Sequence, residues 1–579
     1  MHEIHDRIPI SPWLDQEMNV PEVNDRLAPD KKRLLYITAV AILIAAFVSL
    51  IAKLLVYLIH LITNISFHHT FSLAATSPGT HAYGPWIVLI PAIGGIIVGL
   101  MAFYGSKTIR GHGIPEAMEQ ILTNESKIHP SITYLKPLSS AISIGTGGPF
   151  GAEGPIIATG GALGSTIGQI LKISAYERKI LLAAGATAGM SAIFGSPIAA
   201  IFLAIELLLF EFSPRSIIPV TLACITGAAG HHLFFESGPV FPSPFIAVPG
   251  NVALAVYSCI GVIMGFISAA VTRIVYFIED AFEKIPVHWM WWPMIGGVVV
   301  GIVGYFAPRT LGVGYVNITD LLSGNMTIGV VFSLCIFKFI SWAVALGSGT
   351  SGGTLAPLLT IGGAAGALLG TAAMVIVPHA GVGVSLAVLT GMSAMFAGAS
   401  RALLTSVIFA LETTGQSNAL LPLLAACIAS YVVSYLLMKN TIMTEKIARR
   451  GVATPHMYTP DILDQVKVKQ VLQAGKCVLH YNPLLIKTFQ QNRRSTVTVE
   501  DSLRTAVEAM ARENAETIPV VGLPGKKIEG VLSYKDILSA YRMHFDQQEA
   551  NRTISLKRRT LKMVIRGRKK LSNLKNDKY

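Results

Sequence analysis

The sequence predicts an all-α membrane protein that crosses the bilayer many times and carries a small α/β domain towards its C-terminal end. Three observations support this fold class. The mean hydropathy is +0.56 and only 14% of the 579 residues are charged, whereas a soluble globular chain carries about 25%. Apolar stretches of membrane-spanning length fill most of the chain, and charges return after about residue 453. The 53 glycines and 30 prolines predict tilted, short or broken helices.

The apolar stretches predict where the membrane helices lie in the sequence. A helix needs about 20 apolar residues to cross the hydrocarbon core of a bilayer. Several stretches are longer than one span and contain glycine or proline, so we expect tilted helices or pairs of shorter ones. The stretches cover residues 34–66, 84–104, 156–173, 180–210, 216–235, 245–278, 288–306, 325–346, 354–378, 381–411 and 418–438.

The positive charge is concentrated at the ends of the chain. Of a net charge of +13, residues 551–579 contribute eleven Lys or Arg side chains against one acidic residue. Basic residues also flank the first apolar stretch, at 31–33, and the last, at 439–450. By the positive-inside rule both termini are cytoplasmic. We therefore expect an integral protein of the cell (inner) membrane, with the lipid bilayer as a partner and no nucleic-acid partner.

Changes in composition predict four parts. Residues 1–32 form a cytoplasmic N-terminal segment, 33–452 a transmembrane domain, 453–545 a cytoplasmic domain and 546–579 a basic cytoplasmic tail. Within the third part, residues 497–541 have the pattern of a strand, a helix, two strands and a second helix.

An internal repeat runs through the transmembrane part. Residues 145–168 align without gaps to 347–370, at an offset of 202 residues, and nine of the 24 positions are identical. At the same offset, residues 189–194 match 391–396. Repeated segments interrupted by glycine or proline mark the central site of many transporters, so we expect the transport site in these segments.

Three loops share one form, a glycine-rich turn followed by proline and an apolar helix. They are Gly111-His112-Gly113-Ile114-Pro115, Gly151-Ala152-Glu153-Gly154-Pro155 and Gly353-Thr354-Leu355-Ala356-Pro357. The first amides of a helix lack partners inside it and lie at the positive end of the helix dipole, so a helix start can bind an anion. Together the loops predict helix starts that converge on a monovalent anion. The alternative is that the glycines only permit close helix packing.

Glu153 is the residue expected to gate this site. It is the only charged side chain between residues 137 and 171, and a carboxylate inside a membrane segment is costly and usually functional. Its carboxylate can occupy the anion site as a tethered competitor, until protonation or an incoming anion displaces it. The alternative role is to stabilise a helix start. We expect Glu206 and Glu412 to fasten loops at helix ends.

A membrane enzyme is the alternative from another functional class. It would need paired acids, a nucleophile with a base, or metal ligands within the apolar spans, and the sequence contains no such cluster. The five cysteines form no CxxC pair, so we expect no metal site and no disulfide framework. We therefore expect no catalytic residues.

The three loops, in this order and with the repeat between them, resemble the CLC family of chloride channels and proton/chloride antiporters over residues 30–452. GHGIP, GAEGP and GGTLAP resemble the family motifs GSGIP, GKEGP or GREGP, and GGIFAP. The resemblance implies a homodimer with one pore in each subunit, built from inverted repeats. It also implies that Glu153 is the gate and that the backbone amides of Thr354 and Leu355 line the anion site.

Several positions depart from the family pattern. His112 replaces a serine ligand, Leu355 a phenylalanine and Met443 the pore tyrosine, which leaves the choice among chloride and similar anions open. Leu207 stands where antiporters often carry an inner proton-accepting glutamate. This difference favours an anion channel gated by Glu153, with a proton-coupled chloride antiporter as the alternative.

Residues 497–541 resemble a CBS motif, a regulatory module that often binds adenine nucleotides. The resemblance places Ser533 and Asp536 at the end of the motif that contacts ribose and phosphate. The alternative is that the two side chains cap a helix or face solvent. Apart from an adenine nucleotide at this domain, we expect no cofactor.

Overall fold

The computed structural model describes residues 31–80, 83–235, 238–452, 454–455, 463, 466–473, 496–522 and 528–539. The chain forms two compact units, and each is described by itself. Lys31–Ile173 and Glu177–Thr459 make up the larger one, which holds the apolar helices. The smaller unit includes Pro460–Tyr579. The basic tail predicted at 546–579 lies outside the described residues.

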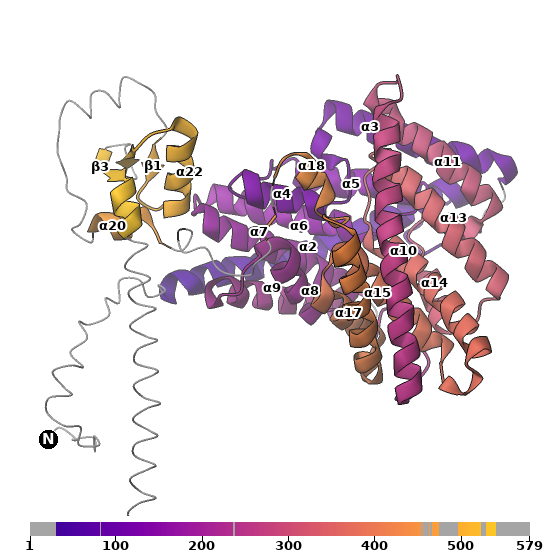
Figure 1. Cartoon of the computed structure of the whole chain (residues 1–579). Helices are drawn as coiled ribbons and strands as arrows, with labels where there is room; N and C mark the ends of the chain where they lie inside the picture. The colour runs from indigo at the N-terminus through magenta and orange to yellow at the C-terminus, as the bar shows by residue number, and fades with distance from the viewer. Residues whose placement is uncertain are drawn as a thin grey trace, which may run out of the picture. The chain divides into compact units, whose positions relative to one another are not determined.

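Within the described residues, eight helical segments are long and apolar enough to cross a membrane. The predicted multi-pass membrane protein is therefore confirmed. In Figure 1 the long helix α10 stands upright beside α17 and α15, whereas α2 and α9 run at a large angle to it. The main helices of these segments are α2 (Lys31–Thr63), α3 (Leu89–Tyr104), α9 (Pro214–Phe234), α10 (Asn251–Glu283), α11 (Trp292–Phe306), α13 (Ile328–Gly347), α14 (Leu355–Ile376) and α17 (Leu420–Leu437).

Shorter helices complete the unit, and two of the long apolar stretches are broken as predicted. The first break contains Gly195, with φ +58°, and precedes Pro197 at the start of α8. The second contains Arg401, with φ +58°. The shorter helices are α4 (Ile114–Thr123), α5 (Ile132–Gly145), α6 (Glu153–Ile170), α7 (Ala175–Phe194), α8 (Pro197–Leu203), α12 (Tyr315–Leu322), α15 (Val384–Ser400), α16 (Leu403–Thr414) and α18 (Glu445–Arg449).

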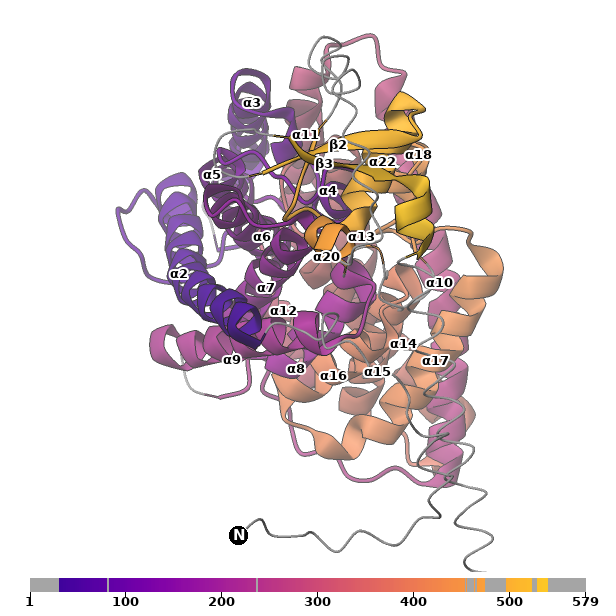
Figure 2. The same ribbon diagram turned by 90° about the vertical axis from the view of Figure 1, so that its left-hand side faces the viewer.

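The helices from α3 to α9 recur in the same order as α11 to α17. Helices α4 and α12 begin 201 residues apart, and α6 and α14 begin 202 residues apart. In sequence the repeat is visible only in two short blocks. In the structure it covers eight successive helices, because α2 to α9 correspond one by one to α10 to α17. Helix α14 packs along α15, α10 along α17, α3 along α11 and α2 along α9. Figure 2 shows the same unit turned by 90°.

The smaller unit contains a three-stranded sheet of β1 (Val497–Thr498), β2 (Thr517–Val521) and β3 (Ile528–Ser533). The strand order is β1-β2-β3, with β1 and β2 parallel and β2 and β3 antiparallel. Helix α22 (Leu503–Glu513) connects β1 to β2, and residues 534–539 are helical. The predicted succession of strand, helix, two strands and helix is confirmed. Helix α20 (Val468–Gln473) adds Val468 and Val471 to the core of this sheet.

Candidate functional site

The three glycine-rich loops, which are far apart in sequence, meet inside the larger unit. Gly151 and Gly353 form an antiparallel bridge, and the Gly353 amide donates to the Gly151 carbonyl at 3.0 Å. Gly111 and Ser351 form a parallel bridge, with the Gly352 amide donating to the Gly111 carbonyl at 3.4 Å. The loops thus come together as their shared form predicted.

The carboxylate of Glu153 lies at the start of the neighbouring helix α14. Glu153 is the first residue of α6 and is 1% exposed. Its Oε1 accepts a hydrogen bond from the Ala356 amide at 2.8 Å, and its Oε2 accepts one from the Tyr315 hydroxyl at 3.3 Å. Since a buried carboxylate needs charge-assisted hydrogen bonds, the helix start and the tyrosine together stabilise it there.

Gly151 makes room for this carboxylate. A Cβ atom on Gly151 would overlap both carboxylate oxygens of Glu153. Gly154 is equally constrained, because a Cβ there would collide with the His112 carbonyl oxygen. The glycines of the second loop are therefore required by close contact with the gate candidate and with the first loop.

The other residues predicted for the anion site are also buried. Thr354 caps α14 and Leu355 is its first residue. The Ala356 amide, one residue later, which the sequence did not single out, donates to Glu153, and the Leu355 amide adds to the stabilisation of the carboxylate. Among the described residues, Met443 makes no polar contact with the three loops. The buried residues are Gly111, His112, Gly113, Ile114, Pro115, Gly151, Ala152, Gly154, Pro155, Thr354, Leu355 and Met443.

A fourth loop, which was not predicted from the sequence, completes the arrangement. Gly312-Val313-Gly314-Tyr315 corresponds to Gly111-His112-Gly113-Ile114 at an offset of 201 residues. Tyr315 begins α12 and packs edge-on against Phe194 and Phe241. The repeated glycine-X-glycine spacing was the available signal, but this copy lacks the proline of the other loops.

Buried lysines hold the first and fourth loops. Lys136 Nζ donates to the carbonyls of Ile109 and Gly111, each at 2.8 Å. Lys338, the residue 202 positions later, donates to the carbonyls of Thr310 at 2.9 Å and Gly312 at 2.8 Å. Each ammonium group thus satisfies two backbone acceptors that the irregular loop leaves without helix partners.

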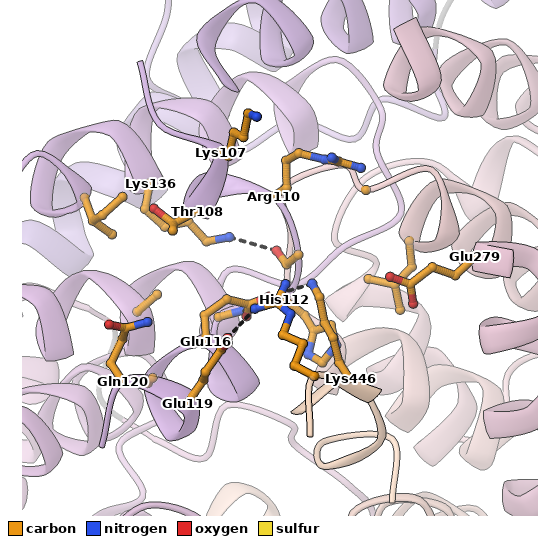
Figure 3. A pocket seen from close by; sticks show the side chains of 18 of the residues that line it. Lys107, Thr108, Arg110, His112, Glu116, Glu119, Gln120, Lys136, Glu279 and Lys446 are labelled. Carbon is orange, nitrogen blue, oxygen red and sulfur yellow. Dashed lines mark hydrogen bonds and ion pairs between the residues drawn. The ribbon is translucent and has the colours of Figure 1, made fainter. Parts of the chain in front are cut away.

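A cavity of about 710 Å³ adjoins the His112 loop. Figure 3 shows His112 between Glu116 and Lys446, with the Glu279 side chain directed towards them from the other side. Lys446 pairs with Glu116 at 2.9 Å, and Glu116 also accepts a hydrogen bond from the Gly113 amide at 2.7 Å. The cavity therefore joins the first loop to a group of charged side chains.

His112 lines this cavity with a buried imidazole. It is 4% exposed, and its Nδ1 has no hydrogen-bond partner among the described residues. Burial lowers the pKa of His112 to about 4, with Glu116 opposing the shift and Lys446 and Lys136 adding to it. The imidazole is therefore neutral at pH 7, with one nitrogen that donates a hydrogen bond and one that accepts.

Glu206 and Glu412 bind at helix ends, as the sequence predicted, and each does so in the other half of the repeat, which was not predicted. Glu206 accepts hydrogen bonds from the amides of Leu404 at 2.9 Å and Thr405 at 3.0 Å, at the start of α16. Glu412 accepts from the amides of Ile198 and Ala199 at the start of α8. Each carboxylate thus caps the helix of the opposite half.

In the smaller unit, Ser533 and Asp536 bond to each other. The amide and hydroxyl of Ser533 both donate to Asp536 Oδ2, at 2.9 Å and 2.6 Å. This contact is the helix cap that the sequence left as the alternative to nucleotide binding. Among the described residues of the whole chain, no cluster of His, Cys, Asp or Glu could hold a metal ion.

Comparisons with known proteins agree with this geometry. Residues 93–435 match the family model described as voltage gated chloride channel, and residues 491–542 match the CBS domain. The chain is similar to a putative chloride channel protein ClcB-like of Ralstonia nicotianae, at 27% identity over 63% of this chain and 86% of the relative. It is also similar to the H(+)/Cl(-) exchange transporter ClcA of Yersinia pestis, at 28% identity over 63% of this chain and 78% of the relative.

Among solved structures, the chain is similar to a slow cyanobacterial Cl-/H+ antiporter. The TM-score is 0.64 and the identity 22%, and the match covers 71% of this chain and 97% of the other. At that identity the likeness supports the fold alone.

Proposed function

The chain belongs to the voltage gated chloride channel family, CLC, and on that premise we propose that it exchanges chloride or a similar monovalent anion for protons across a membrane. The observation that carries the proposal is the Glu153 carboxylate, which accepts a hydrogen bond from the first turn of α14 in the middle of four converging loops. A negatively charged group already held at a helix start shows how an anion could be held there.

The proposed mechanism is a competition between Glu153 and the anion. While ionised, the carboxylate occupies the start of α14 and excludes the anion. An incoming anion displaces the carboxylate, or a proton neutralises it, so that its attraction to the helix dipole falls. Because one side chain alternates between holding a proton and yielding to an anion, movement of the two species becomes linked.

Sequence alone favoured a channel over this exchanger, because Leu207 stands where antiporters often carry an inner glutamate. The name of the Yersinia pestis relative, an exchange transporter, supports the antiporter instead. The antiporter therefore needs another route for protons on the inner side.

We also propose that the protein is a homodimer in the cell (inner) membrane, with both termini in the cytoplasm. The basic residues at 31–33 and 446–450 support this orientation through the positive-inside rule. Cross-linking in native membranes tests the dimer, and labelling of introduced cysteines from either side tests the orientation.

Adenine nucleotide binding at Ser533 and Asp536 stays a prediction. Both groups are engaged with each other, so a nucleotide would have to compete with the Ser533–Asp536 contact. Titration of the full chain with ATP tests it, with Asp536→Ala as the variant that should lose binding.

Reconstituted liposomes test the exchange. A chloride gradient imposed across liposomes that hold the purified protein should drive protons uphill, measured by a pH electrode in unbuffered solution. Empty liposomes serve as the control. Chloride flux without proton movement would favour the channel.

A further inference from the structure

A linked exchange needs a path for protons between Glu153 and the inner solution. The acids that sequence placed near this region are already engaged. Glu206 accepts hydrogen bonds from the amides of Leu404 and Thr405, with a further bond from the Thr405 hydroxyl at 2.6 Å. Glu412 likewise caps α8. Neither carboxylate is free to take up a proton without breaking a helix cap.

The cavity beside His112 is lined by two carboxylates, Glu279 and the exposed Glu283, that have no polar partner among the described residues. Of its acids, Glu116 pairs with Lys446 and Glu119 pairs with Arg450. Glu279, half-buried in the last turns of α10, makes no hydrogen bond or ion pair with any residue that the structure describes. In Figure 3 its carboxylate points into the cavity, towards His112 and Lys446.

The electrostatic surroundings of Glu279 are mixed. Lys446 and Arg449 of α18 and Arg110 of the segment before the first loop attract its negative charge. Glu116 of α4 and Glu283, one turn later on α10, repel it. Charges of both signs therefore lie around the Glu279 carboxylate, and among the described residues it is paired with no single basic side chain.

His112 lies between this cavity and the gate. Its side chain lines the cavity, and its backbone carbonyl lies against Gly154, the residue that follows Glu153. Its Nδ1 is buried and has no hydrogen-bond partner in the described part of the chain. A neutral imidazole can take a proton on one ring nitrogen and release one from the other, so a buried imidazole with a free nitrogen can pass protons on.

We propose that protons travel between the inner solution and Glu153 through Glu279 and His112. The Glu279 carboxylate takes a proton from the inner solution and passes it to one ring nitrogen of His112. The other ring nitrogen then releases its proton towards the Glu153 carboxylate, which leaves the imidazole neutral in its other tautomer, and a turn of the ring between transfers resets it. The reverse sequence returns the proton, and no electrons are transferred. This inference rests on the proposed exchange.

Glu279→Gln tests the route in the reconstituted full chain, with chloride efflux and chloride-driven proton uptake recorded together. Chloride efflux should stay close to that of the unmodified protein, whereas proton uptake per chloride should fall at least about tenfold, as expected on removal of a general acid–base group. Glu283→Gln is the matched control, because Glu283 lines the same cavity but is exposed. It should leave both rates unchanged.

Two further variants keep the test decisive. Glu279→Asp should restore part of the proton uptake, and His112→Asn should lower the ratio of protons to chloride as Glu279→Gln does. An unmodified ratio in Glu279→Gln would overturn the route while leaving the exchange intact. Failure of the unmodified protein to move protons would overturn the exchange and the route together.

Discussion

Lys136 and Lys338 lie 202 residues apart and make the same pair of contacts in the two halves of the membrane unit. Each buried ammonium group donates to two backbone carbonyls of a glycine-containing loop, Ile109 and Gly111 in one half, Thr310 and Gly312 in the other. The two loops place His112 beside the cavity and Tyr315 on the Glu153 carboxylate. The repeat therefore provides matched supports for two different functional side chains.

Lys338→Met should destabilise the protein, because it leaves the carbonyls of Thr310 and Gly312 buried without a donor. Each unpaired buried group costs about 1–3 kcal/mol, so the thermal unfolding midpoint in detergent should fall clearly. Lys284→Met is the control, since Lys284 is exposed. An unfolding midpoint equal to that of the control would refute the supporting role.

Much of this arrangement could be predicted from the sequence. The shared form of the three loops, the constant offset and the isolated Glu153 sufficed to predict converging helix starts with a carboxylate among them. Lys136 and Lys338 are separated by the same offset, but two lysines in apolar helices give no indication of which carbonyls they bind. That information depends on the tertiary fold.

The contributions of Tyr315 and Ala356 could not be predicted in the same way. Tyr315 replaces Ile114 of the first repeat, so its hydroxyl breaks the internal similarity at the position where it contacts Glu153. The Ala356 amide lies one residue beyond the positions that the family motif indicates, so its bond to Glu153 could not be read from the motif. In the smaller unit, by contrast, the pattern predicted over residues 497–541 contains every described strand.

Tyr315→Phe should speed anion flux. The hydroxyl donates to Glu153 Oε2 at 3.3 Å, and loss of one such bond is worth about 1 kcal/mol, or about fivefold in the population of the displaced carboxylate. Chloride efflux from liposomes measures this change. Tyr257→Phe is the control, because its hydroxyl instead bonds to Gly383. Equal efflux from both variants would show that the tyrosine does not hold the gate.

Gly151→Ala should displace the Glu153 carboxylate, because the added methyl group would occupy the space of its oxygens. We expect anion flux that depends less on pH than in the unmodified protein, with the fold retained. Gly161→Ala is a suitable control, since a Cβ there makes only ordinary contacts with Leu182 and Ala186. A pH profile identical to the control's would contradict the close packing of Gly151 on the carboxylate.

Glu206→Ala should lower stability without changing the ratio of protons to anions. The variant removes the acceptor of the Leu404 and Thr405 amides at the start of α16, and loss of a helix cap costs about 0.5–2 kcal/mol. Thermal unfolding and liposome flux should be measured on one preparation. A changed ratio with an unchanged unfolding midpoint would instead assign Glu206 to transport.

The most direct test of the central claim is simultaneous recording of chloride efflux and proton uptake by Glu153→Gln in liposomes. The amide has nearly the shape of the protonated carboxyl group but neither ionises nor carries a proton. We predict that chloride efflux persists and no longer depends on pH, while chloride-driven proton uptake disappears. Proton uptake at the rate of the unmodified protein, or chloride efflux with an unaltered pH profile, would contradict the assignment of Glu153 as the gate.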